Sequence, residues 1–235
     1  MTVLSNCEQY QKIGNHNVYT ANGVSGEFKS SVINTVEKME NYSPASKAAV
    51  DKLKNIIILK DTNSEIPKQF PQTNEKFHTY ASDAYGFVSK SDNAIVLIED
   101  NHKRKNAVLE GNTASQGADT FTHETGHLID KELSTTEIFK SAYLKDLKNL
   151  EFALKEGNST VYGENLQEMV NYLHHYIEGV NFEDGIDESD ISREGLRENF
   201  AECFSTMSDS SPSKINLIFS ALFPNTMNAA KKLTL

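Results

Sequence analysis

The chain has 235 residues, enough for one large domain or for a catalytic domain with a small N-terminal elaboration. Hydrophobic residues make up 38% and charged residues 24%, a balance typical of a soluble globular protein rather than a disordered one. With 23 basic against 33 acidic residues, the net charge of −10 disfavours nucleic acid and anionic membranes as partners.

The sequence shows neither a membrane span nor a secretory signal peptide. Its apolar runs have the length of strands and fall short of the roughly 20 residues that cross a bilayer. Residues 1–8 contain neither a basic segment nor an apolar core. We therefore expect a protein that stays in the cytoplasm, or one that is secreted or delivered without a classical signal peptide. Cys7 and Cys203 are expected to be free thiols, with one long-range disulfide as the alternative.

The N-terminal part of the chain alternates between irregular and regular patterns. Residues 1–26 show little periodicity and are predicted to be an irregular lead-in. Apolar residues at helical spacing predict a helix over 28–39, and Ser43-Pro44 begins a second one. The apolar run 56–59 predicts a strand, and the polar, proline-containing stretch 61–84 predicts a loop.

Two further strands, 86–88 and 93–99, are expected to form a hairpin-like pair. A polar connection over 100–117 follows, and a helix is predicted from about Asp119 to beyond Asp130. Four more helices are then expected, one opened by a capping box at 134–137 and closed at Gly157, and others over about 164–178, about 192–207 and from Ser211 onward, with an acidic loop at 182–190.

These elements predict an α+β fold with a small strand-bearing N-terminal half and a mainly helical C-terminal half. We expect a single domain over 1–235. After the lead-in 1–26, it would comprise an N-terminal lobe, 27–118, that carries an edge strand, and a helical lobe, 119–235, that carries the functional residues.

The pentapeptide His123-Glu124-Thr125-Gly126-His127 carries the clearest chemical signal. On a helix, two histidines four residues apart lie on one face and can bind one Zn²⁺. Glu124 can then reach a metal-bound water without being a ligand, and can accept its proton as the water attacks a carbonyl. The competing interpretation is a solvated helix face.

A peptidase zinc site needs a third protein ligand, and the stretch 192–204 offers one. Glu194, Glu198 and Glu202 are spaced by four residues, so they line one face of the expected helix. In a metal site one of these carboxylates would bind zinc, while another would hold the second ring nitrogen of a histidine. The alternative is an exposed acidic face.

Two motifs of this chain resemble those of a known family, the anthrax-lethal-factor-like and Pro-Pro-endopeptidase group of gluzincin zinc metallopeptidases. They are His-Glu-x-Gly-His and the later stretch Glu198-Asn199-Phe200-Ala201-Glu202-Cys203-Phe204. The resemblance implies a zincin-like fold with Zn²⁺ as cofactor. It makes His123, His127 and Glu198 the metal ligands, Glu124 the general base, and Glu202 a support for the ligands. Residues 85–87 and the strand 93–99 also resemble the family's strands, whose edge pairs with an extended peptide substrate.

One position departs from the family pattern. The family has an oxyanion-stabilising tyrosine seven residues before the third ligand, and this chain has Ile191 there. The replacement donors that the sequence leaves open are Tyr162, Tyr172, Tyr176, His174 and His175.

The resemblance implies a zinc-dependent endopeptidase that hydrolyses a protein or peptide substrate, a secreted bacterial toxin or effector with a host-protein target being one form of it. Two alternatives stay open. The first is a catalytically inactive binding module on the same fold, which the missing tyrosine favours, and the second is a zinc hydrolase of a non-peptide substrate.

Overall fold

The computed structural model describes residues 9–80, 82, 84–103, 106–157, 159–183 and 185–235. The chain divides into two compact units, one up to Leu128 and the other from Ile129 onward. The first carries a five-stranded sheet and the second is mainly helical, so the predicted α+β class and the distribution of strands and helices are confirmed.

The sheet of the first unit has the strand order β1-β2-β3-β5-β4. Its three inner strands, β2 (His16–Thr20), β3 (Asn55–Leu59) and β5 (Ala94–Ile98), run parallel. The two edge strands, β1 (Gln9–Ile13) and β4 (Gly86–Ser89), pair antiparallel with their neighbours. All five residues of β5 are buried, as expected for an inner strand covered on both faces.

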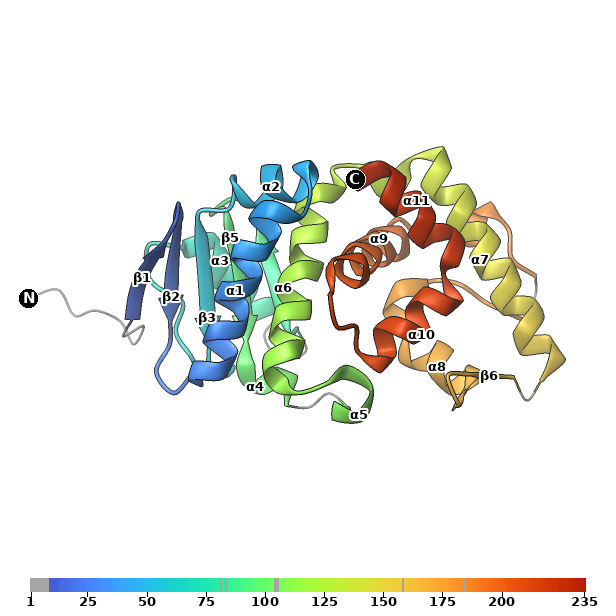
Figure 1. The fold of residues 1–235 in the computed structure, drawn as a ribbon, viewed down its shortest axis with the longest axis horizontal. Helices are drawn as coiled ribbons and strands as arrows, with labels where there is room; N and C mark the ends of the chain where they lie inside the picture. The colour runs from blue at the N-terminus through green and yellow to red at the C-terminus, as the bar shows by residue number, and fades with distance from the viewer. Residues whose placement is uncertain (1–8, 81, 83, 104–105, 158, 184) are drawn as a thin grey trace, which may run out of the picture. The chain divides into compact units, whose positions relative to one another are not determined.

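Helices cover both faces of this sheet (Figure 1). α3 (Pro71–Tyr80) packs through Phe77 in an apolar cluster with Ile57 and Val96. The opposite face of the sheet presents Leu97. On that side lie α1 (Gly26–Tyr42), α2 (Pro44–Val50) and α6 (Thr113–Asp130), with the short helices α4 (Glu99–His102) and α5 (Ala107–Glu110) on the way to α6.

α6 approaches α1 closely at Gly117. A Cβ atom at this position would lie 2.4 Å from Cε2 of Phe28, which is fully buried on α1. Glycine therefore permits a helix–helix contact that any larger residue would obstruct. This contact fixes the first half of α6 against the rest of the unit.

The described residues of the second unit form five α-helices, three 3₁₀ turns and a two-stranded hairpin. The α-helices are α7 (Glu137–Glu156), α8 (Leu166–Tyr172), α9 (Arg193–Ser208), α10 (Lys214–Leu222) and α11 (Pro224–Thr234). The 3₁₀ turns are η1 (Leu133–Thr135), η2 (His174–Ile177) and η3 (Glu188–Asp190), and the hairpin pairs β6 (Thr160–Val161) with β7 (Glu164–Asn165). Within this unit α9 is largely buried, with Phe200 and Phe204 fully enclosed.

Several N-terminal predictions were wrong. The lead-in 1–26 contains the β1–β2 hairpin, whose turn is made by Gly14 at a φ of +54°. The predicted loop 61–84 contains α3, which begins at Pro71, and the polar connection 100–117 contains α4, α5 and the start of α6. In each case a polar composition predicted irregular structure, whereas packing against the rest of the protein stabilises strands or helices there.

Boundaries also differ in the helical unit. Thr136, rather than Ser134, accepts the hydrogen bond that caps α7. The helix predicted over 164–178 is divided into α8 and η2, and the last predicted helix is divided into α10 and α11 at Phe223-Pro224. Proline at the first turn of α11 lacks the N–H that would continue α10. Cys7 lies outside the described residues, and Cys203 is a buried free thiol.

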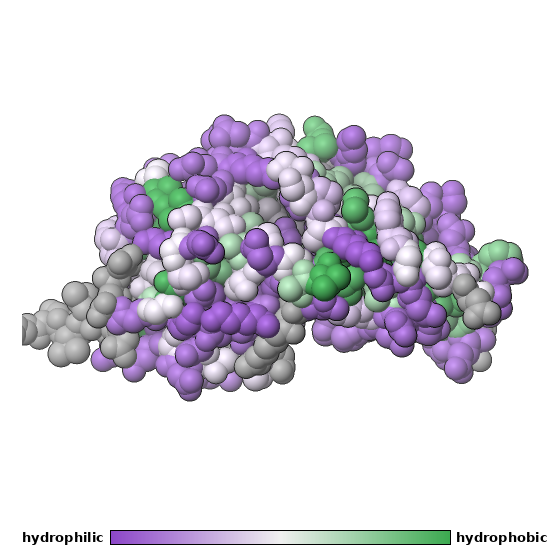
Figure 2. Space-filling model, turned by 60° about the horizontal axis from the view of Figure 1, so that its bottom comes forward, coloured by the Kyte–Doolittle hydropathy of each residue, from purple (hydrophilic) through white to green (hydrophobic). Residues whose placement is uncertain are grey.

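None of the helices in the described part of the chain combines the length and apolar composition that crossing a bilayer requires. On the face drawn in Figure 2, hydrophilic side chains predominate and apolar ones appear in separate small areas.

Candidate metal centre

The predicted zinc-binding pentapeptide lies in the C-terminal half of α6. The helix is capped by Asn112, whose side chain accepts a hydrogen bond from the backbone N–H of Ser115 at 2.9 Å. Fully buried Phe121 anchors the helix to the core. Helix geometry then places His123 and His127 one turn apart on the same face.

The two imidazole rings are close and nearly perpendicular. Their centroids are 4.9 Å apart with an interplanar angle of 83°, and both side chains are half-buried. Glu124, beside the first histidine, is only 7% exposed. The half-buried imidazole pair of α6 therefore stands next to a buried carboxylate.

The helix α9 carries the three glutamates at spacing four. Ser192 caps it by accepting a hydrogen bond from the N–H of Gly195 at 2.8 Å. Glu194 is exposed and forms an ion pair with Arg197, whereas Glu198 is half-buried and Glu202 is 9% exposed. The predicted acidic face therefore has distinct environments along its length, and Glu194 lies on its exposed part.

His123, His127 and Glu198 form a group with metal-binding potential. One possible ligand atom from each side chain lies within 4.8 Å of the other two, and all three residues are half-buried. Nitrogen and oxygen ligands at about 2.1 Å from a tetrahedral Zn²⁺ stand ~3.4 Å from one another. The 4.8 Å within which these three donor atoms lie is wider than that spacing.

Asp130, the last residue of α6, belongs to the second unit and has two partners within it. Its carboxylate accepts a hydrogen bond from the N–H of Ser134 at 2.8 Å and lies 3.7 Å from Nε of Arg197. Asp130 thus accepts a hydrogen bond from η1 and forms an ion pair with Arg197, the residue that precedes Glu198.

The candidate oxyanion donors occupy different surroundings. Tyr162 is 55% exposed in the turn between β6 and β7. The ring of Tyr176 packs edge-on against Phe219 at 5.4 Å. His174 and His175 lie in η2, with ring centroids 3.8 Å apart.

The turn η2 is tied to α9 near the third candidate ligand. The carbonyl oxygen of Tyr176 accepts hydrogen bonds from the Tyr143 hydroxyl at 2.7 Å and from Nδ2 of Asn199 at 3.4 Å. Burial and the neighbouring His174 lower the pKa of His175, and the negative charges of Glu198 and Glu178 partly oppose that shift. His175 therefore lies within the electrostatic field of Glu198.

Burial affects two ionisable groups of the second unit, the Tyr143 hydroxyl and the Cys203 thiol. Burial raises the pKa of the Tyr143 hydroxyl, and a coulombic effect of Cys203 adds to it. Burial, followed by the charges of Glu202 and Asp146, raises the pKa of the Cys203 thiol well above its ordinary value. Cys203 is thus a packing residue, as its apolar context in the sequence indicates, and not a reactive thiolate.

Comparison with known proteins adds no relative. No family model matches the sequence, and a search of the curated proteins finds no similar one. A function for this chain is therefore inferred from its own residues and their geometry.

The sequence gives no indication of His102, a fully buried residue at the end of α4 that forms a hydrogen bond with Thr120 of α6. It lies in a polar stretch with no periodicity and no metal-ligand spacing to either neighbouring histidine. Only the three-dimensional structure shows which groups its two ring nitrogens contact.

Proposed function

We propose that the protein is a zinc-dependent endopeptidase in which His123, His127 and Glu198 hold the metal. The grouping of these three donors, with Glu124 adjacent to the first, is the observation that carries the proposal. Two neutral imidazoles and one carboxylate are a ligand set typical of catalytic zinc, which keeps a further position open. A purely structural site would instead close with four protein ligands.

Bound Zn²⁺ would supply Lewis acidity, polarising a substrate carbonyl and lowering the pKa of a water molecule. Glu124 would accept a proton from the attacking water as its oxygen bonds to the carbonyl carbon. The same carboxyl group would then donate this proton to the departing amine nitrogen as the C–N bond breaks. Its burial, at 7% exposure, favours that role because a buried carboxyl group exchanges its proton less readily with bulk water.

The edge strand β4 offers a means of holding an extended peptide. It pairs with β5 on one side and is the last strand of the sheet. A peptide that adds to such an edge forms main-chain hydrogen bonds whatever its sequence. Gly86 of β4 is in close contact with Thr120 of α6, which brings this edge next to the helix that carries Glu124.

Metal content would test the site directly. Inductively coupled plasma mass spectrometry of the purified protein should give one zinc per chain, and His123→Ala and Glu198→Ala should each lose most of it. Glu194→Ala is the matched control, because Glu194 lies one turn earlier on α9 but is exposed and paired with Arg197. If Glu198→Ala retains its zinc while Glu202→Ala loses it, the third-ligand assignment is wrong.

Catalysis needs a separate test. Glu124→Gln should retain zinc and lose cleavage of a mixed peptide library by a factor of about 10² or more, because the proton acceptor is removed while the ligands remain. A wild-type protein that binds zinc but cleaves no peptide would instead support the inactive binding module. Ile191, at the position of the family's oxyanion tyrosine, is the residue that favours this second candidate. Delivery as a toxin or effector stays a prediction.

A further inference from the structure

His102 makes two hydrogen bonds from a fully buried position. Its Nδ1 lies 2.8 Å from the carbonyl oxygen of Ile98, and its Nε2 lies 2.9 Å from Oγ1 of Thr120. A carbonyl oxygen can only accept, so Nδ1 must carry the proton in this arrangement. In the neutral ring Nε2 then accepts from the Thr120 hydroxyl. One imidazole thus connects the end of β5 to α6.

Thr120 occupies a particular face of α6. It precedes His123, Glu124 and His127 by three, four and seven residues, and these spacings place all four side chains along one side of the helix. A helix turn moves nearly as a rigid body. A shift of Thr120 would therefore be carried to the metal-binding residues one turn further on.

The methyl group of Thr120 is held as well as its hydroxyl. A Cβ atom added to Gly86 of β4 would lie 2.8 Å from Cγ2 of Thr120, so the edge strand and the helix are in tight contact there. The imidazole of His102 is itself packed between aromatic rings, with centroids 5.1 Å from Phe28 and 5.5 Å from Tyr85. Both partners of the hydrogen bond are therefore in contact with further side chains or with the strand β4.

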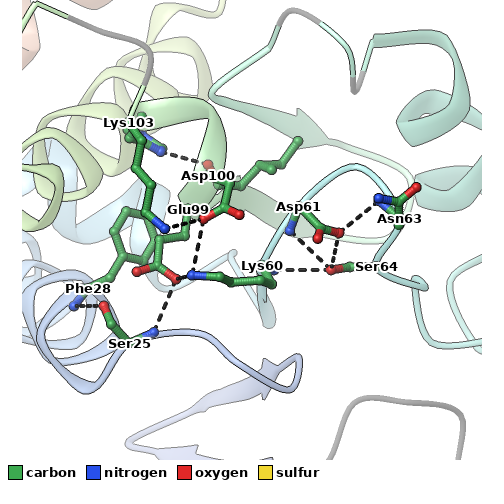
Figure 3. A network of polar contacts seen from close by, with 11 residues as sticks. Ser25, Phe28, Lys60, Asp61, Asn63, Ser64, Glu99, Asp100 and Lys103 are labelled. Atoms are coloured by element: carbon green, nitrogen blue, oxygen red, sulfur yellow. Dashed lines mark hydrogen bonds and ion pairs between the residues drawn. The ribbon is translucent and has the colours of Figure 1, made fainter.

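The short helix that carries His102 is fixed at its beginning (Figure 3). Glu99, 2% exposed, accepts hydrogen bonds from Nζ of Lys60 at 2.8 Å and from the backbone N–H of Ser25 at 3.1 Å. Lys60 follows β3 directly and Ser25 caps α1, so Glu99 ties α4 to two other elements of the unit. His102, one turn later, is thereby held relative to the sheet.

We propose that His102 is a positioning residue that sets the place of the metal-binding face of α6 through its hydrogen bond with Thr120. This inference rests on the proposed zinc site. His102 touches neither the metal nor the substrate in this role. It acts on the ligands through the helix that carries two of them.

A pair of substitutions at Thr120 separates this role from simple packing. Thr120→Val keeps the branched shape against Gly86 and removes the hydroxyl, whereas Thr120→Ser keeps the hydroxyl and removes the methyl group. We expect Thr120→Val to weaken zinc binding about tenfold, the low end of what supporting partners of metal ligands contribute. Thr120→Ser should remain within about twofold of wild type, because it leaves the hydrogen bond in place.

Thr226→Val is the matched control. Thr226 is fully buried and donates its hydroxyl to the buried carboxylate of Asp146 at 2.6 Å, far along the chain from α6. This variant should lose stability and leave the zinc affinity unchanged. Zinc affinity is measured by competition with a chromophoric chelator, and stability by urea unfolding of the metal-free protein. The ¹⁵N shifts of the His102 ring should report protonated Nδ1 in wild type and Thr120→Ser.

The outcomes distinguish the inference from the proposed function. Wild-type zinc affinity in Thr120→Val, or an equal loss in Thr120→Ser, would overturn the positioning role while leaving the zinc site intact. An equal loss in Thr226→Val would show that affinity follows stability alone, and would also overturn it. A wild-type protein that binds no zinc would remove the proposed function itself, and this inference with it.

Discussion

Gly117→Ala sets two physical effects against each other on the helix that carries the candidate metal ligands. Helix propensity alone favours alanine over glycine by about 1 kcal/mol. Against this, the new methyl carbon would lie 2.4 Å from Cε2 and 2.7 Å from Cζ of Phe28. Carbon atoms in contact normally stand about 3.5–4.0 Å apart, so the shortfall is roughly 1 Å.

Phe28 cannot withdraw easily, because its ring is fully buried and in contact with His102. Overpacking of this kind costs about 1–3 kcal/mol, and the size of the overlap points to the upper end. After the gain in helix propensity is subtracted, we expect Gly117→Ala to destabilise the protein by about 2 kcal/mol.

Urea unfolding followed by circular dichroism would measure the change in the free energy of unfolding. Gly26→Ala provides the control, since a Cβ atom added at this position of α1 would have nothing within 4 Å, and the variant should be neutral or slightly stabilising. Phe28→Leu should partly relieve the clash, so the double variant should lose less stability than the sum of the two single ones. A Gly117→Ala protein as stable as wild type would refute the reasoning.

Two further predictions concern buried carboxylates. Burial alone would raise the pKa of Glu99, but hydrogen bonds from Lys60 and Ser25 outweigh it and lower the pKa below its ordinary 4.5. The unfolded chain therefore takes up this proton first, and the contribution of Glu99 is complete at neutral pH and lost as the pH falls through its lowered folded pKa. Glu99→Gln should lower the free energy of unfolding by about 2 kcal/mol at pH 7, and stability should fall less steeply in acid than in wild type. Thermal unfolding across pH measures both effects, and an unchanged slope in acid would contradict the prediction. Asp146→Asn should destabilise the protein by about 2 kcal/mol at pH 7, because the fully buried carboxylate accepts four hydrogen bonds from Asn225 and Thr226 at the start of α11. A variant with the melting temperature of wild type would show that these hydrogen bonds do not stabilise the fold.

The sequence by itself determined the features that depend on local periodicity. Consecutive apolar residues were enough to predict β3 and β5, because inner strands of a parallel sheet are buried on both faces. The four-residue spacing of His123 and His127 was enough to predict two imidazoles on one face, because helix geometry is the same wherever the helix lies. The helix predicted over about 192–207 is α9, and the structure shows Ser192 capping it at the predicted start.

Tertiary structure decided what depends on contacts between distant residues. The polar strand β1 exists because β2 pairs with it, and α3 exists because Phe77 reaches the apolar cluster beneath it; neither has a strong pattern of its own. The differing burial of Glu194, Glu198 and Glu202 is likewise invisible in a regular spacing of four.

For the same reason, the hydrogen bonds of His102 could not be predicted from the sequence. Its partners are a carbonyl four residues earlier and a hydroxyl eighteen residues later, and only the packing of α6 against the sheet brings that hydroxyl to the ring. Periodicity in a sequence reports which face of an element is buried, because burial repeats with the turns of the backbone. It carries no information on which distant side chain a buried polar group will meet.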